Sequence, residues 1–233
     1  MALMAGFTAA QAADPQEVWE QAVKAKGGRE RLKNVHSLAI YLKPANVNLS
    51  GPPGTWLCVF PNRYFEYVAA GPGGTERAIV VDGDADRVAM DVTGMPRRAR
   101  QVGPAERDHL TLNQIVFLLE SAWLQPQLIG VKRNVLTVQA GERTFRVTLS
   151  SSSLPERIQA LPNRGDKPKI SYDYHLDNYG DFQGVLLPKR VGLISGLRER
   201  IWDADYEVDA KYNPKLFERM PNLADGPEPW RKR

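Results

Sequence analysis

The sequence has few of the residues that build disulfides, metal sites and nucleophilic catalytic centres. Its 233 residues include one cysteine, Cys58, and three histidines. A single cysteine excludes an internal disulfide. The histidines (His36, His109 and His175) are scattered over two predicted strands and a predicted helix, and neither a G-x-S-x-G motif nor a glycine-rich phosphate loop is present. We therefore expect no metal, no cofactor and no catalysis.

Long apolar runs and a strong charge excess are also absent. No run approaches the roughly 18 apolar residues that a membrane-spanning helix requires. The formal net charge of +4 is spread along the chain, and its densest basic groups are residues 97–100 and 231–233. Neither group contains interleaved aromatic residues, so we do not expect nucleic acid as a partner.

The N-terminal residues resemble the end of a secretory signal. A short apolar stretch runs into Ala10-Gln11-Ala12, an A-x-A cleavage pattern. Cys58 lies too far from this point to be a lipidation cysteine. We expect residues 1–12 to be a signal-peptide remnant, residues 13–221 a single domain and residues 222–233 a C-terminal tail, with the mature protein soluble in the periplasm.

Residues 198–209 read R-E-R-I-W-D-A-D-Y-E-V-D and provide the clearest structural signal. From Trp202 onward, apolar residues alternate with acidic ones: Trp202, Ala204, Tyr206 and Val208 against Asp203, Asp205, Glu207 and Asp209. Because strand side chains have a period of two, this pattern predicts a half-buried antiparallel strand. The acidic row is either the solvated back of an edge strand, where charge opposes aggregation, or a docking surface for a basic partner.

Other periodic segments predict a mainly β protein with two helices. The helices are expected at 15–26, with a last turn at 29–34, and at 105–124; 93–104 is expected to be a loop. Eleven strands are expected at 35–42, 56–60, 63–69, 76–81, 86–91, 131–139, 143–149, 156–161, 169–176, 185–194 and 198–209. The short connections between strands predict a strongly curved antiparallel sheet. More of helix 105–124 is apolar than one packed face needs, which favours a position inside or across the hollow of that sheet.

Several motifs, taken in order, resemble the LolA/LolB-like periplasmic proteins. They are A-K-G-G-R-E-R-L-K-N-V (25–35), P-N-R-Y-F-E (61–66), I-V-V-D-G (79–83), G-V-L-L-P (184–188) and V-D-A-K-Y-N-P-K-L-F (208–217). The resemblance implies an incomplete β-barrel of about eleven strands with a helical lid over a hydrophobic cavity. It also implies a carrier that takes lipid or lipoprotein acyl chains from an inner-membrane donor to an outer-membrane acceptor. The absence of an N-terminal lipidation cysteine resembles the soluble carrier branch of the family.

The inward positions of the predicted strands and the second helix are the candidates for the lipid-binding cavity. They are Phe60, Phe65, Tyr67, Val81, Leu118, Val147, Tyr172, Tyr174, Trp202 and Tyr206. The alternative is that these side chains only pack against one another and the helices. We also expect Arg97, Arg98 and Arg100 to contact anionic lipid headgroups transiently at the cavity mouth. A sensor or regulatory module that recognises a protein or a mislocalised lipoprotein on the same fold is the alternative function.

Overall fold

A computed structural model describes residues 14–45, 51–71, 74–162, 172–196 and 198–231. Within them, one antiparallel sheet contains thirteen strands: β1 (Ser37–Pro44), β2 (Gly54–Val59), β3 (Arg63–Val68), β4 (Arg77–Asp82), β5 (Arg87–Val92), β6 (Arg98–Gln101), β7 (Gln127–Lys132), β8 (Val135–Ala140), β9 (Arg143–Leu149), β10 (Pro155–Ala160), β11 (Tyr172–Phe182), β12 (Val185–Ser195) and β13 (Arg198–Val208). The α-helices are α1 (Pro15–Ala25), α2 (Arg29–Lys33) and α3 (Pro104–Leu118), and three short 3₁₀ turns follow β13. The predicted signal remnant lies outside the described residues.

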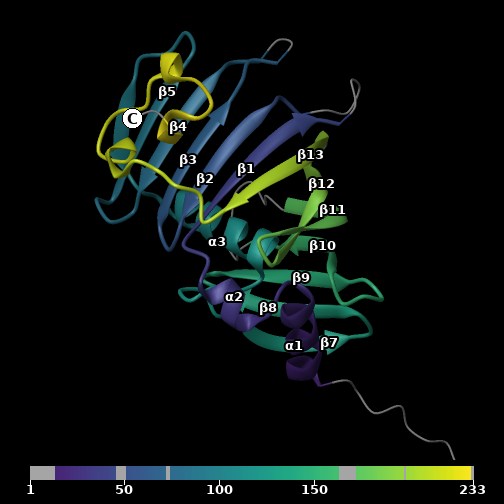
Figure 1. Ribbon diagram of the computed structural model, residues 1–233. Helices are drawn as coiled ribbons and strands as arrows, with labels where there is room; N and C mark the ends of the chain where they lie inside the picture. Colours follow the sequence, from purple (N-terminus) through teal and green to yellow (C-terminus); the bar gives the residue numbers. More distant parts are fainter. Residues whose placement is uncertain (1–13, 46–50, 72–73, 163–171, 197, 232–233) are drawn as a thin grey trace, which may run out of the picture.

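The sheet is open, with β6 and β7 at its two edges and the order β6-β5-β4-β3-β2-β1-β13-β12-β11-β10-β9-β8-β7. β13, the most clearly predicted strand, lies at the centre of the sheet and not at an edge, because it pairs with both β1 and β12. In the β1 pairing, Val208 lies opposite Leu38 and Tyr206 opposite Ile40. The sheet bends around α3, while α1 and α2 lie near β7 and β8 (Figure 1). The predicted fold class, a curved and incomplete antiparallel barrel with helices, is confirmed.

Two strands were missed, for different physical reasons. β6 is a four-residue edge strand whose residues are all exposed, so no hydrophobic alternation marks it. The predicted strand 131–139 is instead divided between β7 and β8 by a turn in which Arg133 has a φ of 57°. Asn134 stabilises this turn, because its side-chain amide donates to the Leu149 carbonyl at 2.8 Å.

Helix α3 is shorter than the predicted 105–124. It begins at Pro104 and is capped by Glu106, which accepts a hydrogen bond from the Gly103 backbone N–H at 2.9 Å. It ends at Leu118, because Leu119 adopts a φ of 67° and leaves the helical conformation. The following turn is held by the Ser121 hydroxyl, which accepts from the backbone N–H of Trp123 and Leu124. No helix in the described part of the chain has the length and apolar character that crossing a membrane requires.

The part of the outer, convex face that is formed by β1 to β5 is covered by residues 213–231, which we call the C-terminal strap (Figure 1). Leu216, Phe217 and Trp230 of the strap pack with Phe65 and Val80 in a buried cluster. Trp230 is 2% exposed. Residues 222–231, which the sequence prediction placed in a tail, are therefore part of the packed structure.

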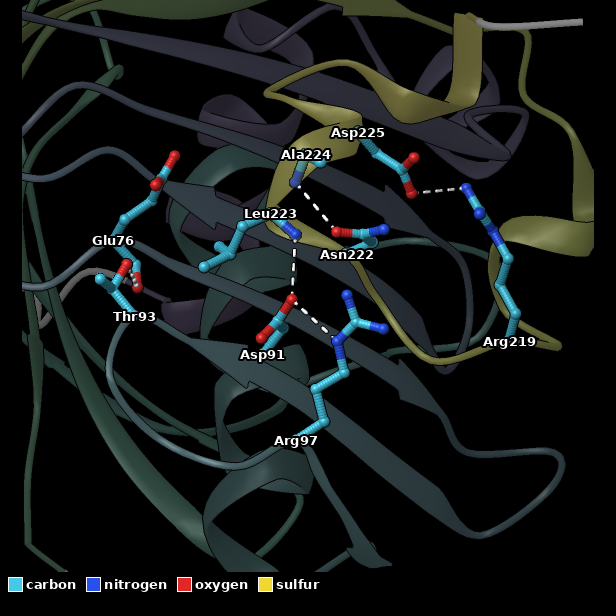
Figure 2. A network of polar contacts seen from close by, with 9 residues as sticks. All are labelled: Glu76, Asp91, Thr93, Arg97, Arg219, Asn222, Leu223, Ala224 and Asp225. Atoms are coloured by element: carbon cyan, nitrogen blue, oxygen red, sulfur yellow. Dashed lines mark hydrogen bonds and ion pairs between the residues drawn. The ribbon is translucent and has the colours of Figure 1, made fainter.

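Polar contacts tie the strap to the end of β5 and the loop that follows it. The Asp91 carboxylate accepts hydrogen bonds from the Leu223 backbone N–H and from Arg97 Nε, both at 3.1 Å (Figure 2). Within the strap, Arg219 forms an ion pair with Asp225 at 2.7 Å (Figure 2). The strap is thus anchored by both its apolar side chains and its polar groups.

Candidate functional site

Helix α3 fills much of the hollow on the inner face of the sheet. Every residue from Leu112 to Ser121 is buried, including the polar residues Asn113 and Gln114. A helix buried on all sides lies inside a protein rather than on its surface. The prediction that this helix lies in the hollow of the sheet agrees with its position in Figure 1.

Most of the predicted cavity residues do gather on this inner face. Phe60, Val81, Leu118, Val147, Tyr174, Trp202 and Tyr206 belong to one buried cluster, and Tyr172 packs at its border. Tyr206 illustrates the packing, because its ring lies edge-on to Phe117 of α3 and to Phe182, with centroids 5.9 and 5.0 Å apart. Its hydroxyl donates to the Pro188 carbonyl at 2.6 Å.

The face predicted for Phe65 and Tyr67 is wrong. Both side chains belong to the outer cluster beneath the C-terminal strap. Their strand neighbours Tyr64 and Glu66 point inward instead, since successive side chains on a strand alternate between the two faces. Tyr64 and Phe65 are each 2% exposed, so burial alone does not distinguish the inner face of β3 from the outer one.

Polar pairs at its two ends hold α3 against the rest of the protein. Near the N-terminal end, the Asp108 carboxylate accepts a hydrogen bond from the Arg143 guanidinium of β9 at 2.7 Å. Just after the C-terminal end, the buried Glu120 carboxylate accepts from the Trp19 indole at 3.1 Å and lies 3.2 Å from Arg29. Both attachments join α3 to elements distant in sequence.

Between these ends, the packing of α3 leaves polar atoms without partners. His109, Asn113 and Phe117 lie four residues apart and so share one face of the helix. The rings of His109 and Phe117 both contact Trp56 of β2, at centroid distances of 6.4 and 6.3 Å. Neither the Asn113 side-chain amide nor the Trp56 indole N–H has a hydrogen-bond partner in the described structure. An unpaired buried donor costs about 1–3 kcal/mol, so this interface is weaker than its apolar content suggests.

A pocket of about 220 Å³ opens on the inner face between the first turns of α3 and strands β3 to β5. It is lined by Tyr64, Glu66, Arg77, Ile79, Val81, Val88, Met90, Ala105, Glu106 and His109. Val81 is the one predicted cavity residue in this lining. Ligand pockets usually measure roughly 300–1,000 Å³, so this one accommodates only part of a long acyl chain while α3 stays in place.

One wall of the pocket is a hydrogen-bonded network around Glu66, which is 4% exposed. Its carboxylate accepts from the Tyr64 hydroxyl at 2.7 Å and from Arg77 Nε at 2.7 Å. His109 Nε2 lies 3.3 Å from the Tyr64 oxygen. Burial, followed by the nearby Glu66 charge, raises the pKa of Tyr64 well above its usual value, and burial lowers the pKa of His109. At neutral pH the network therefore contains a neutral phenol, a neutral imidazole and one carboxylate–guanidinium pair.

The sequence analysis missed this network because it assigned Phe65 and Tyr67, rather than Tyr64 and Glu66, to the inner face. The signal that could have identified the network is a lone glutamate between aromatic residues on a buried strand, since such a carboxylate requires a partner. Within the described residues, no three histidine, cysteine or acidic side chains are grouped closely enough to hold a metal ion.

The three arginines predicted at the cavity mouth do not form one group. Arg97 pairs with Asp91 beside the C-terminal strap on the outer face. Arg98 and Arg100 lie opposite Met90 and Val88 in the β5–β6 register and so share the face of the pocket. Arg100 forms an ion pair with Glu106 of α3. Arg97 therefore does not lie at the cavity mouth, where it was predicted.

Comparison with known proteins identifies the fold. A scan against protein-family models and a sequence search of curated proteins both give no match. A solved LolA superfamily protein from Nitrosomonas europaea matches with a TM-score of 0.54 at 12% identity, over 89% of this chain and 99% of that one. A DUF1329 family protein from Desulfovibrio piger gives a TM-score of 0.42 at 10% identity, over 89% of this chain and 98% of that one. The first likeness shows that the chain has a LolA-like fold.

Proposed function

Because the fold is LolA-like, we propose that the protein binds lipid or lipoprotein acyl chains in the hollow of its sheet, carries them through the periplasm towards the outer membrane, and catalyses no reaction. The observation that carries this proposal is the position of α3, an apolar helix enclosed by an open sheet. An acyl chain that replaces α3 in part of these apolar contacts is removed from water. This removal stabilises the bound state by about 0.8 kcal/mol per buried CH₂ group.

Loading requires α3 to move, because the existing pocket of about 220 Å³ is small. The features that attach α3 are suited to such movement. Its ends are held by a few polar pairs, Asp108 with Arg143 and Glu120 with Trp19 and Arg29. Its middle carries the unpaired Asn113 amide, which lowers the free energy gained when the helix docks.

The cellular setting is part of the same proposal. The A-x-A pattern at Ala10–Ala12 supports export, and the fold is one found in a LolA superfamily protein. A carrier in the periplasm would exchange its cargo with a donor at the inner membrane and an acceptor at the outer membrane.

The direct test is to extract protein purified from a bacterial periplasm with organic solvent and to analyse the extract by mass spectrometry. We expect acyl lipid in near-stoichiometric amount. The Asp108→Asn variant weakens the attachment of α3 to β9 and should retain more lipid. Asp203→Asn is the matched control, because it removes a similar ion pair, with Arg190 at 3.0 Å, from the exposed face of β13. Lipid-free extracts from both the unaltered protein and Asp108→Asn, or turnover of model esters, would contradict the proposal.

A further inference from the structure

The pocket beneath the first turns of α3 has two walls of different chemistry. Its floor is apolar and comes from the inward residues of β4 and β5: Ile79, Val81, Val88 and Met90. The rest of the lining includes the polar network of Tyr64, Glu66, Arg77 and His109. A bare acyl chain would match only the floor. The combination suits a ligand that has both an aliphatic part and a polar head.

The charged residues at the mouth of the pocket determine whether an anionic or a cationic head group is favoured. Glu66 is neutralised by Arg77 of β4, and Glu106 by Arg100 of β6. Arg98 is exposed on the pocket face of β6 and has no ion-pair partner among the described residues. Both glutamates of the lining are thus paired with an arginine, and Arg98 adds one unpaired positive charge on the adjoining face of β6.

Two of these guanidinium groups have donors to spare. Arg77 uses Nε and one terminal nitrogen for Glu66, and its side chain is 46% exposed. Because a guanidinium has five N–H donors in a planar fork, Arg77 retains free donors and Arg98 retains all of its own. The buried Glu66 carboxylate holds Arg77 in position at the rim. Such forks bind carboxylate and phosphate groups in a bidentate manner.

We propose that this pocket binds a single-chain anionic amphiphile, with its carboxylate or phosphate head at Arg77 and Arg98 and its chain along the apolar floor. The inference rests on the proposed carrier function and deepens it, because it specifies the part of the hollow that first receives a lipid and the charge of its head. The small volume favours one chain over two. From the floor, the chain continues past His109 towards Trp56 and Phe117, where α3 covers the hollow.

The test uses displacement of the fluorescent fatty acid 11-(dansylamino)undecanoic acid from delipidated protein. Four competitors share a chain of the same length and differ only in the head group: dodecanoate, a lauroyl lysophosphatidylglycerol, dodecyltrimethylammonium and dodecanol. We expect the two anionic competitors to displace the probe and the cationic and neutral ones to bind about tenfold more weakly, because they lack charge-assisted hydrogen bonds. Comparison of dodecanoate with the lysolipid distinguishes a carboxylate from a phosphate ligand.

Two variants locate the site. Arg98→Gln should lower the affinity of the anionic competitors about tenfold and leave the affinity of dodecanol unchanged. The control Arg146→Gln removes an exposed arginine from the outer face of β9 and should change neither affinity. Met90→Trp fills the pocket from a half-buried position and should abolish probe binding. Its control is Ile129→Trp, at a position that is 58% exposed on β7.

The outcomes separate this inference from the carrier proposal. Equal binding of the probe by the unaltered protein and by Met90→Trp, or equal competition by all four amphiphiles, would overturn the inference while a lipid in the extracted protein still supports a carrier. Absence of probe binding together with a lipid-free extract, including from Asp108→Asn, would overturn both.

Discussion

Helix α3 packs on the inner side of the sheet and the C-terminal strap on part of its outer side, and the two sides differ in how well their buried polar groups are satisfied. Within the described structure, five buried side-chain polar atoms have no hydrogen-bond partner. Four lie on the inner side, on Lys26, Trp56, Asn113 and Glu120, and one lies on the outer side, on Trp230. At about 1–3 kcal/mol each, these atoms make the inner packing considerably more costly than the outer packing.

The difference indicates distinct roles for the two coverings. The C-terminal strap is joined to the sheet by an apolar cluster and by hydrogen bonds at Asp91 and Glu207, as a permanent part of the fold. Helix α3 is joined mainly by apolar contacts that a lipid could replace and by polar pairs at its ends. The following predictions test whether the outer face is structural and the inner face exchangeable.

The largest effect is expected at the outer face. Trp230→Ala removes a side chain that is 2% exposed and stacks edge-on against Phe65, so the free energy of unfolding should fall by about 3–5 kcal/mol. Urea denaturation measures this change. Trp123→Ala, at a position that is 42% exposed, is the control and should cost much less. Equal losses for the two variants would contradict a structural role for the strap.

A substitution of Lys26 on the inner side is expected to increase the free energy of unfolding. This fully buried residue lies over the Tyr179 ring, 5.2 Å from its centroid, and burial lowers its pKa to about 7. Lys26→Met should raise the free energy of unfolding at pH 7 by about 2–4 kcal/mol, because folding no longer has to remove an amine from water. The exposed Lys24→Met is the matched control and should give no such gain.

The pH dependence of stability provides an independent check on Lys26. The unfolded lysine has a pKa of about 10.4, so between pH 7 and that value the unfolded state binds more protons than the folded state. The contribution of Lys26 should therefore make the unaltered protein more stable as the pH rises from 7 to 10. Lys26→Met should lack this slope, and equal slopes in the two proteins would show that the amine is solvated.

The smallest effect is expected at α3 and is the most informative for function. Asn113→Leu replaces an unpaired amide with an apolar group of similar shape, so stability should rise by about 1–2 kcal/mol and lipid uptake should decrease, because α3 docks more firmly. Gln114→Leu is the control. Its amide is hydrogen-bonded to Ser121 and Pro61, so the same substitution should destabilise the protein. Unchanged lipid uptake in Asn113→Leu would argue against movement of α3.

Much of the fold could be predicted, because its signals are local. The alternation from Trp202 to Asp209 identified β13, and the apolar excess in 105–124 indicated a helix within the hollow. The face of β3 could not be predicted, because Tyr64 and Phe65 are equally buried on opposite sides. The pocket network was missed for the same reason, since it joins Glu66 of β3 to His109 of α3 across the interior.

By itself, the sequence determined an antiparallel sheet with short turns, because strand alternation and turn formation depend on neighbouring residues. The tertiary structure alone decided which face became the hollow, that residues 222–231 pack on part of the other face, and that Arg98 lies beside Met90. These features depend on the direction in which the sheet curves and on contacts between distant segments, such as β1 with β13 and the strap with β5. No local pattern encodes that direction, because either face of a strand with large side chains on both sides can be the inner one.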